Sequence, residues 1–327
     1  MPGKVLNWGF ICTADINKAL IQPLKDSKRN RLAAVASRTQ AAAEAYAREW
    51  KIPRAFGSYE ALLASPEVDV VYNALPNHLH AEWTIKALRA GKHVLCEKPF
   101  ALTTTEVEAM GAAAQETRRV LAEAFMYRHH PQTLKVKEIL EDGLLGSIKT
   151  LRGSFTIQFK RENNYRWNPE MGGGALWDVG CYPLSYMRAM LGAEPLEVFG
   201  WQVKGSSGID EIFTAQLRFP GEILAQFDCS FIIPFHAFME LVGDEGTLIV
   251  PTPFAPKTKE SLFLTREGRT EKISIKAPGL YEGEVEDMAD AILEGKPPRI
   301  SLADSRANVR AILALFESAR LGQPVTL

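Results

Sequence analysis

The sequence predicts an α/β fold in two parts: a doubly wound parallel sheet, followed by an α+β domain with a large, mainly antiparallel open sheet. Strand-like apolar segments alternate with helical segments over the first ~120 residues, which is the rhythm of successive βαβ units. From about residue 125, strand-like segments follow one another with Gly- or Pro-containing turns between them, which is typical of antiparallel hairpins. A chain of 327 residues suits two domains, which we expect over 1–124 and 125–327.

The N-terminal elements follow from short apolar segments and the helical segments between them. Because each strand is followed by a helix, the strands should be parallel and the helices should cover both faces of the sheet. Pro23 should kink or end the first helix. The expected strands are 5–11, 31–36, 68–74, 93–97 and 119–123. The expected helices are 14–26, 39–50, 58–65, 77–90 and 103–117.

The C-terminal elements are mostly strands joined by tight turns such as Pro220-Gly221. Helices are expected over 131–142, 283–294 and 302–320, and a Gly-rich loop followed by a helix over 172–191. Strands are expected over 148–160, 196–204, 210–219, 222–233, 235–242 and 245–250, with two more over 261–275. A large apolar patch is seldom left exposed, so a sheet with one uncovered face predicts a homodimer or homotetramer.

Composition argues against several classes of function. The 38 Lys and Arg residues nearly balance 39 Asp and Glu residues, so a net charge of -1 provides no general field for nucleic acid. The cysteines and histidines lack the spacing of a metal site, and free thiols at 12, 96, 181 and 229 indicate a reducing compartment. No apolar run reaches the ~18 residues of a membrane span, and no signal segment is seen. We therefore expect a cytoplasmic protein with a small-molecule partner and without metal, nucleic acid or membrane.

The turn after the first strand has the position of a dinucleotide-binding turn. It precedes a helix at the start of a βαβ series, where backbone amides at the helix N-terminus hold a pyrophosphate. Aligned with G-x-G-x-x-G, the sequence has Cys12, Ala14 and Asn17 in place of the glycines, so the motif alone does not establish a dinucleotide site. Small residues still permit close approach of the phosphate. The expected cofactor-binding residues of this turn are Cys12, Thr13, Ala14, Asp15 and Ile16.

The end of the second strand predicts which dinucleotide is bound. Enzymes specific for NAD usually carry an acidic residue here, which holds the ribose 2′-hydroxyl and would repel a 2′-phosphate. This sequence has Ser37 and Arg38 instead, and a hydroxyl with a guanidinium suits a phosphate. We therefore expect NADP as the cofactor, with NAD as the alternative. A solvated side chain at the start of a helix is the alternative for Arg38.

Two further strand ends lie at the same edge of the parallel sheet, outside which ligands bind. The residues expected to bind the cofactor after the strand at 68–74 are Leu75, Pro76, Asn77 and His80. Asn77 also fits the N-cap of a helix, which is its structural alternative. The next strand ends in Glu97 and Lys98 before Pro99, which places a lysine at the cofactor cleft, with a surface lysine as the alternative.

Taken together, these features resemble the Gfo/Idh/MocA oxidoreductase family over nearly the whole chain. The motifs that carry the resemblance are W-G-F-I-C-T-A-D-I at 8–16, Pro76-Asn77-x-x-His80, Glu97-Lys98-Pro99 and Gly172-Gly173-Gly174-x-x-x-Asp178-x-Gly180, in the family's order. The resemblance implies a Rossmann dinucleotide-binding domain, Glu97 and Lys98 at the cofactor, and a second domain whose open sheet often makes the oligomer contact.

One departure from the family's pattern narrows the resemblance. Many members have D-x-x-x-H in the later helix, whereas this chain has Asp178-x-x-x-Tyr182. With the segment at 123–128, this is similar to the branch that contains dihydrodiol dehydrogenases, NADP-dependent D-xylose dehydrogenases and sugar ketoreductases. The resemblance implies Lys98 and Tyr182 as catalytic residues, with Asp178 beside them.

The chemistry of these residue types fits a hydride transfer. A tyrosine hydroxyl titrates near ~10, and lowering its pKa by ~2–3 units requires roughly 3–4 kcal/mol of phenolate stabilisation, which the Lys98 ammonium can supply. Tyr182 would then accept a proton in oxidation or donate one in reduction. Asp178 would hold substrate hydroxyls or orient the lysine, and in an α-helix it shares a face with Tyr182. A packed tyrosine and an ordinary ion pair are the structural alternatives.

Candidate substrate residues precede and include this helix. The expected substrate-binding residues are Tyr165, Arg166, Trp167, Asp178 and Tyr182, with Asn163 as a further candidate. A solvated loop is an equal alternative for 163–167. The sequence thus predicts an NADP(H)-dependent oxidoreductase acting on a carbohydrate-like CH–OH group. The alternatives are a trans-dihydrodiol dehydrogenase, a nucleotide-sugar ketoreductase, or a cofactor-binding regulator without catalysis, against which Lys98 and Tyr182 both argue.

Overall fold

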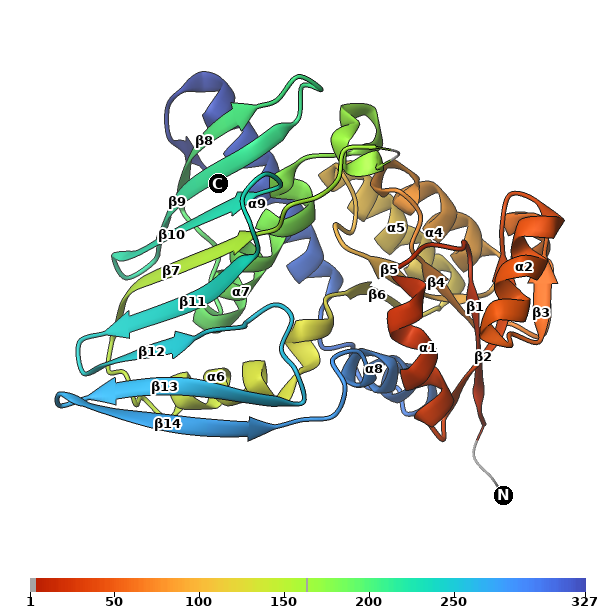
Figure 1. The fold of residues 1–327 in the computed structure, drawn as a ribbon, viewed down its shortest axis with the longest axis horizontal. Helices are drawn as coiled ribbons and strands as arrows, with labels where there is room; N and C mark the ends of the chain where they lie inside the picture. Colours follow the sequence, from red (N-terminus) through yellow and green to blue (C-terminus); the bar gives the residue numbers. More distant parts are fainter. Residues whose placement is uncertain (1–3, 163) are drawn as a thin grey trace. The chain divides into compact units, whose positions relative to one another are not determined.

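The computed structural model describes residues 4–162 and 164–327, which form two compact units (Figure 1). The first unit runs to His129 and also contains Tyr281–Arg306, and the second consists of His130–Leu280 and Ala307–Leu327. A segment late in the chain therefore packs with the N-terminal unit. The predicted boundary at residue 124 places this late segment in the second domain instead.

The first unit is a doubly wound sheet of six parallel strands in the order β3-β2-β1-β4-β5-β6, as predicted. The strand order reverses between β1 and β4, and ligands of such sheets bind outside the carboxyl ends of the strands at this point. The strands are β1 (Leu6–Phe10), β2 (Asn30–Ala36), β3 (Arg54–Phe56), β4 (Val70–Asn73), β5 (His93–Glu97) and β6 (Leu121–Ala124). The helices are α1 (Asn17–Asp26), α2 (Gln40–Trp50), α3 (Tyr59–Ala64), α4 (His80–Arg89), α5 (Thr104–Thr117) and α8 (Glu282–Leu293).

Local sequence signals explain where several helices of this unit begin. Thr39 caps α2 by accepting a hydrogen bond from a backbone amide, and Thr103 forms a capping box with Glu106 at the start of α5. Pro23 lies inside α1, which continues beyond it to Asp26, so of the two expected outcomes, a kink or an end, the end is wrong. Tertiary packing outweighs the lost hydrogen bond, because Leu24 in the last turn is buried.

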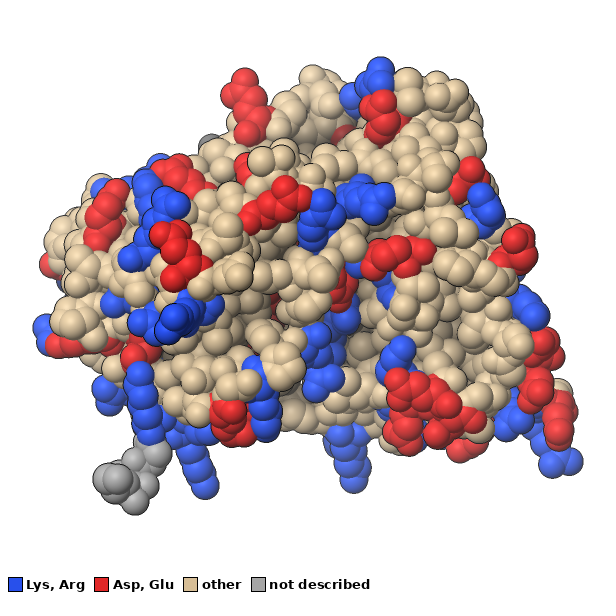
Figure 2. All heavy atoms as spheres, turned by 180° about the vertical axis from the view of Figure 1, so that it is seen from behind, with Lys and Arg blue, Asp and Glu red and all other residues tan. Residues whose placement is uncertain are grey.

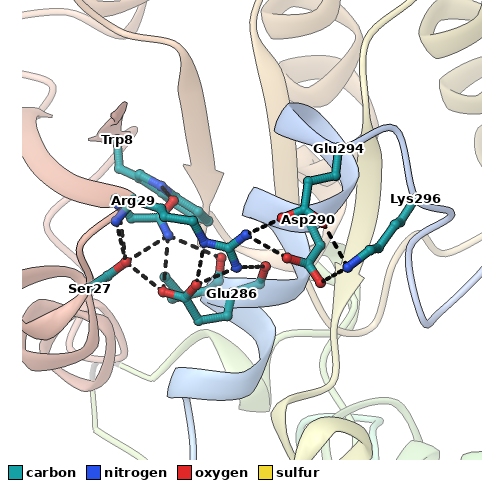
Figure 3. A network of polar contacts seen from close by, with 9 residues as sticks. Trp8, Ser27, Arg29, Glu286, Asp290, Glu294 and Lys296 are labelled. Atoms are coloured by element: carbon teal, nitrogen blue, oxygen red, sulfur yellow. Dashed lines mark hydrogen bonds and ion pairs between the residues drawn. The ribbon is translucent and has the colours of Figure 1, made fainter. Parts of the chain in front are cut away.

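An arginine just before β2 fixes α8 within the first unit (Figure 3). The Arg29 guanidinium forms ion pairs with Glu286 at 2.5 Å, Asp290 at 2.6 Å and Glu294 at 2.8 Å. Ser27 Oγ also donates a hydrogen bond to Glu286, at 2.5 Å. Three carboxylates on successive turns at one side of the helix thus share one half-buried guanidinium, which stabilises the return of the late segment.

The second unit is built on a sheet of nine strands in the order β14-β13-β12-β11-β7-β10-β9-β8-β15. The neighbouring pairs are antiparallel except β7 and β10, which are parallel, so the prediction of a large, mainly antiparallel sheet is confirmed. The strands are β7 (Ile148–Thr156), β8 (Glu197–Lys204), β9 (Asp210–Phe219), β10 (Ile223–Ser230), β11 (His236–Gly243), β12 (Gly246–Val250), β13 (Lys259–Arg266), β14 (Arg269–Lys276) and β15 (Val325–Thr326). The helices are α6 (Pro131–Glu141), α7 (Cys181–Leu191) and most of α9 (Leu302–Leu321).

Helices cover one face of this sheet. The helix α7 packs on β7 and β10, and α6 packs on β13 and β14 (Figure 1). Several large apolar side chains of the strands remain exposed to solvent, and Trp201 is 65% exposed and Leu224 57% exposed. The sheet is therefore open, as predicted.

Charges of both signs are interspersed on the face shown in Figure 2, in keeping with the net charge of -1. Within the part of the chain that the structure describes, no helix has the length and apolar character needed to cross a membrane. The same residues contain no group of His, Cys, Asp and Glu side chains arranged to hold a metal ion. All four cysteines are free and buried.

Replacing Arg29 by Met should lower the free energy of unfolding by about 2 kcal/mol, because hydrogen bonds to charged groups are lost and three carboxylates lose their shared cation. Urea-induced unfolding measures this change. The matched control is Arg48→Met in α2, whose side chain is 73% exposed and meets Glu44 at 3.8 Å. It should change stability by less than about 0.5 kcal/mol, and equal effects of the two substitutions would contradict the assignment.

Candidate functional site

The turn between β1 and α1 is held by the asparagine in the third glycine position of the motif. Asn17 Nδ2 donates to the carbonyl oxygen of Cys12 at 2.6 Å, and Cys12 Sγ lies 3.3 Å from the carbonyl oxygen of Ala74. Both side chains are buried, and burial raises the pKa of the Cys12 thiol to about 12, so the thiol stays uncharged. The turn thus presents no thiolate to a pyrophosphate. The sequence did not lead us to predict that Asn17 holds this turn. The signal for this role in the sequence is an asparagine where the motif has a glycine.

At the start of α1, the amides of Asn17, Lys18 and Ala19 donate to the carbonyl oxygens of Ala14, Asp15 and Ile16 at 3.1, 3.2 and 3.0 Å. Ile16 occupies the N-cap position, and no side chain among the described residues caps the helix there. The Asp15 carboxylate is exposed and pairs with Lys18 at 2.7 Å. The expected residues Thr13, Ala14, Asp15 and Ile16 form this turn. The positive end of the helix dipole at this turn suits a pyrophosphate.

The end of β2 presents an exposed guanidinium. Arg38 is exposed, and among residues 4–162 and 164–327 no carboxylate forms an ion pair with it. Ser37 before it is buried, with its amide donating to the Phe56 carbonyl oxygen at 3.0 Å. Thr39 after it caps α2. Its neighbours are therefore fixed, while the Arg38 side chain remains available for a phosphate.

His80 joins the loop after β4 to the segment after β5. Its ring is buried, with one nitrogen 2.7 Å from the Leu75 carbonyl oxygen and the other 2.8 Å from the Pro99 carbonyl oxygen. Burial lowers the pKa of His80 to about 4, although both carbonyl oxygens favour the charged form. A neutral imidazole has one N–H, so the ring donates a hydrogen bond to one of these two carbonyl oxygens, and its contact with a cofactor stays a prediction. Asn77 is buried and begins a short 3₁₀ turn after Pro76.

The glutamate before Lys98 is engaged by protein donors on both oxygens. Tyr72 Oη donates to Glu97 Oε1 at 2.5 Å, and the backbone amide of Lys98 donates to Glu97 Oε2 at 3.2 Å. These bonds orient the peptide that carries Lys98, whose side chain is partly exposed. Sequence analysis named Glu97 as a cofactor-binding residue, which stays a prediction. It missed Tyr72, because a tyrosine in an apolar strand also fits a packed core residue.

A second carboxyl group, on Glu284 of α8, lies within the electrostatic range of Glu97. Glu284 is 1% exposed, and neither of its oxygens has a hydrogen-bond partner among the described residues. Burial, and after it the charge of Glu97, raises the pKa of Glu284 well above its usual range. Burial likewise raises the pKa of Tyr281, which lies in the field of Glu97 and Lys98. The surroundings of Glu284 therefore favour its protonated form.

In the second unit, Arg166 brings Asp178 and Tyr182 together. Arg166 Nε donates to Asp178 Oδ2 at 2.7 Å, and the Asp178 side chain is 5% exposed. Burial alone lowers the pKa of the Arg166 guanidinium, but the charges of Asp178, Tyr165 and Tyr182 outweigh it and raise this pKa above its ordinary value. The guanidinium in turn favours the phenolate form of Tyr182.

The segment that carries Asp178 is π-helical. The π-turn η5 spans Leu176–Gly180, and α7 begins at Cys181. The expectation of a Gly-rich loop and a helix over 172–191 is therefore confirmed, while the wider turn at the start of the helix was not predicted. Asp178 and Tyr182 lie on either side of the change in helix type, and wide turns of this kind are frequent at functional sites.

Aromatic packing fixes the ring of Tyr182. The side chain is buried, and its ring meets Phe155 edge-on at a centroid distance of 5.2 Å and Phe254 at 5.7 Å. The ring is therefore held in place, and the hydroxyl is the part of this side chain that can move a proton.

The segment before the glycine run is packed and not a solvated loop. Trp167 is buried, and its Nε1 donates to the Lys160 carbonyl oxygen at 3.0 Å. The guanidinium of Arg166 lies 4.9 Å from the ring centroid of Tyr165. The solvated alternative is wrong for Trp167 and Arg166, while substrate contact by Tyr165, Arg166 and Trp167 stays a prediction. Asn163 lies outside the described residues.

Replacing His80 by Asn should reduce the pH dependence of stability. The pKa of His80 is about 4 in the folded protein and about 6.5 in the unfolded chain, so the unfolded chain binds the proton first as pH falls. Stability is thus lost below about pH 6.5, and this one group accounts for about 2 kcal/mol at pH ~5. Urea unfolding at about pH 7.5 and pH 5 measures the loss in each protein.

The control for this substitution is His236→Asn, because His236 is exposed on β11. The control should keep the wild-type loss of stability on acidification. A wild-type pH dependence in His80→Asn would show that the His80 ring is not buried in its neutral form.

Family models match both parts of the chain. A model described as an oxidoreductase family with an NAD-binding Rossmann fold matches residues 6–125. A model of the GFO/IDH/MocA C-terminal domain matches residues 133–249.

Characterised proteins are also similar over most of the chain. D-xylose 1-dehydrogenase (NADP(+)) 2 of Haloferax volcanii is 34% identical over 98% of this chain and 99% of its own. Trans-1,2-dihydrobenzene-1,2-diol dehydrogenase of Danio rerio is 32% identical over 75% of this chain and 74% of its own. A 3-ketoreductase from Actinomadura kijaniata, solved with NADP and TDP-benzene, has a TM-score of 0.91 and 30% identity, covering 96% of this chain and 98% of its own. Variants of that enzyme with a lysine or a tyrosine replaced have been solved, and these two positions have the same sequence separation as Lys98 and Tyr182.

Proposed function

The chain belongs to the Gfo/Idh/MocA oxidoreductase family, and we propose that it transfers a hydride between NADP(H) and the carbonyl or hydroxyl carbon of a sugar or sugar-like polyol. The observation that carries this proposal is the buried cluster in which Arg166 holds Asp178 and lies in the field of Tyr182. A phenol beside a guanidinium both gives and takes a proton, which the interconversion of C–OH and C=O requires. The D-xylose dehydrogenase relative supports a sugar as substrate.

We assign Lys98 and Tyr182 to the reacting oxygen. In oxidation, the substrate hydroxyl gives its proton to Tyr182, and in reduction Tyr182 returns a proton to the carbonyl oxygen. Lys98 and Arg166 carry the positive charge that favours the phenolate, and Asp178 accepts hydrogen bonds from substrate hydroxyls. A bound nicotinamide takes up the hydride in oxidation and supplies it in reduction.

The first unit fits an NADP molecule. The turn before α1, with the small residue Ala14 and the uncharged Cys12, would hold the pyrophosphate at the positive end of the helix dipole. Arg38, with Ser37, would hold the 2′-phosphate, because no acidic residue stands at the end of β2. The loop at 75–80 and the segment at 97–98 would lie beside the nicotinamide half. NADP in the names of two relatives supports this choice, and NAD is the alternative.

Two other substrates fit the same machinery, a nucleotide-linked ketosugar and a trans-dihydrodiol. The first is favoured by the structural likeness to the 3-ketoreductase solved with NADP and TDP-benzene, and the second by the diol dehydrogenase relative. A screen of free sugars, nucleotide sugars and trans-diols, followed by absorbance of the reduced nicotinamide, decides among the three. A cofactor-binding regulator without turnover is disfavoured by the presence of both Lys98 and Tyr182.

We further propose that the chain forms a homodimer or homotetramer through the open face of the nine-stranded sheet. The exposed Trp201 and Leu224 support this assembly, because large apolar side chains gathered on one face usually meet a partner. We place the protein in the cytoplasm, where its four free thiols would stay reduced.

Replacing Arg38 by Ala should weaken NADPH binding by roughly ten- to a hundred-fold and leave NADH binding nearly unchanged, because only NADPH carries the 2′-phosphate that the guanidinium would hold. Fluorescence titration of each reduced cofactor measures both affinities. Arg48→Ala in α2 is the control and should change neither affinity. A wild-type preference for NADH would overturn the NADP assignment.

Replacing Tyr182 by Phe, or Lys98 by Met, should lower kcat by roughly 10²- to 10⁴-fold, because the proton donor or its electrostatic partner is lost. NADPH affinity of Tyr182→Phe, measured by fluorescence titration, should stay within about twofold. The control is Tyr186→Phe, which removes a buried hydroxyl one turn later on α7, where the ring also contacts Phe254. Undiminished turnover of Lys98→Met would refute the catalytic assignment.

A further inference from the structure

The glycine run before η5 is required by the approach of two groups from elsewhere in the second unit. A Cβ atom at Gly173 would overlap the Arg166 carbonyl group, and one at Gly174 would overlap the Asp210 carboxylate. Gly174 also has a φ of +124°, which side chains rarely allow. The run therefore serves to admit a carboxylate to the first turn of the helix that leads to Tyr182.

Asp210 caps this turn from a distant strand. It is the first residue of β9 and is 2% exposed, and its Oδ2 accepts a hydrogen bond from the Leu176 amide at 2.7 Å. The residue in the N-cap position of η5, Ala175, makes no side-chain cap of its own. Asp210 thus satisfies an amide at the helix start that would otherwise lack a partner, and it ties the helix start to the sheet.

The capped turn is linked by hydrogen bonds to the cluster around Arg166. The Gly174 amide donates to the Arg166 carbonyl oxygen at 3.0 Å, and the Asp178 amide donates to the Gly174 carbonyl oxygen at 3.2 Å. The Arg166 side chain in turn donates a hydrogen bond to the Asp178 carboxylate. The positions of Arg166 and Asp178 therefore both depend on the turn that Asp210 holds.

We propose that Asp210 is a positioning residue, whose carboxylate fixes the first turn of η5 so that Asp178 and Tyr182 meet Arg166 in one arrangement. The hydrogen bond that Asp210 accepts comes from the Leu176 amide in this turn, so Asp210 acts through the turn. This inference rests on the proposed function, because positioning matters only for the reaction that Tyr182 serves. A misplacement of about 1 Å at such a site costs roughly a hundredfold in rate.

The charge on Asp210 changes within the physiological pH range. Burial raises the pKa of Asp210 to about 7, although the hydrogen bond from the Leu176 amide and the charge of Lys204 on β8 lower it. The Cys229 thiol on β10 also lies in the electrostatic field of Asp210. An ionised carboxylate accepts a stronger hydrogen bond than a protonated one. Turnover should therefore rise as pH rises through about 7, provided that Asp210 is present.

The test compares Asp210→Asn with Asp244→Asn in the full-length protein. Asp244 is the matched control, because its Oδ1 accepts the Ser147 amide at 2.7 Å and a Cβ at Gly146 would likewise overlap its carboxylate, but it lies on an exposed hairpin. Asp210→Asn should lower kcat by roughly 10- to 100-fold, with NADPH affinity within about twofold of wild type, and should lose the rise near pH 7. Asp244→Asn should keep all three wild-type values.

Hydrogen exchange followed by mass spectrometry separates this inference from the proposed function. Asp210→Asn should speed exchange of amides in 175–182 and leave exchange of β1 and β5 unchanged, and Gly174→Ala should reproduce both effects. Wild-type kcat and pH profile in Asp210→Asn would overturn the positioning role. If wild-type protein turns over no sugar or diol, the proposed function fails, and unchanged exchange in 175–182 would then overturn the inference as well.

Discussion

A charge removed from water needs an opposite partner or must be given up, and this constraint shapes the functional residues of both units. Arg166 and Asp178 meet it as a buried ion pair. Burial favours the uncharged form of the Glu284 carboxyl group, of the His80 ring and of the Cys12 thiol.

More charged groups act on the Tyr182 phenol than the residue types in the sequence indicate. Sequence analysis assigned stabilisation of the Tyr182 phenolate to Lys98, whereas the structure adds Arg166 as a cation within the same unit. Because Asp178 already pairs with Arg166, it limits how strongly that guanidinium acts on the phenol. Arg166 therefore contributes to the roughly 3–4 kcal/mol needed to bring a tyrosine into the working pH range, and Asp178 reduces that contribution.

Features with a local signal could be read from the sequence, and features made by distant contacts could not. Alternation of strands and helices predicted both sheets, and motif order singled out Lys98, Asp178 and Tyr182. The roles of Tyr72 and Asp210 depend on partners more than twenty residues away, 25 for Tyr72 and 34 for Asp210, so nothing beside them in the sequence reveals the contact. The three glycines at 172–174 could be seen in the sequence, but the close contacts that require glycine there could not. The assignment of α8 to the C-terminal domain failed for the same reason, because its partner Arg29 lies at the other end of the chain.

The return of α8 to the first unit has a consequence for how the chain is made. This helix contacts α1 and β2, so the nucleotide-binding half cannot close its core while the ribosome has delivered only its contiguous part. The chain must be synthesised as far as Arg306 before that half is complete, and no single cut yields it as an intact piece. Exchanging the second half between relatives would therefore require two matched junctions instead of one.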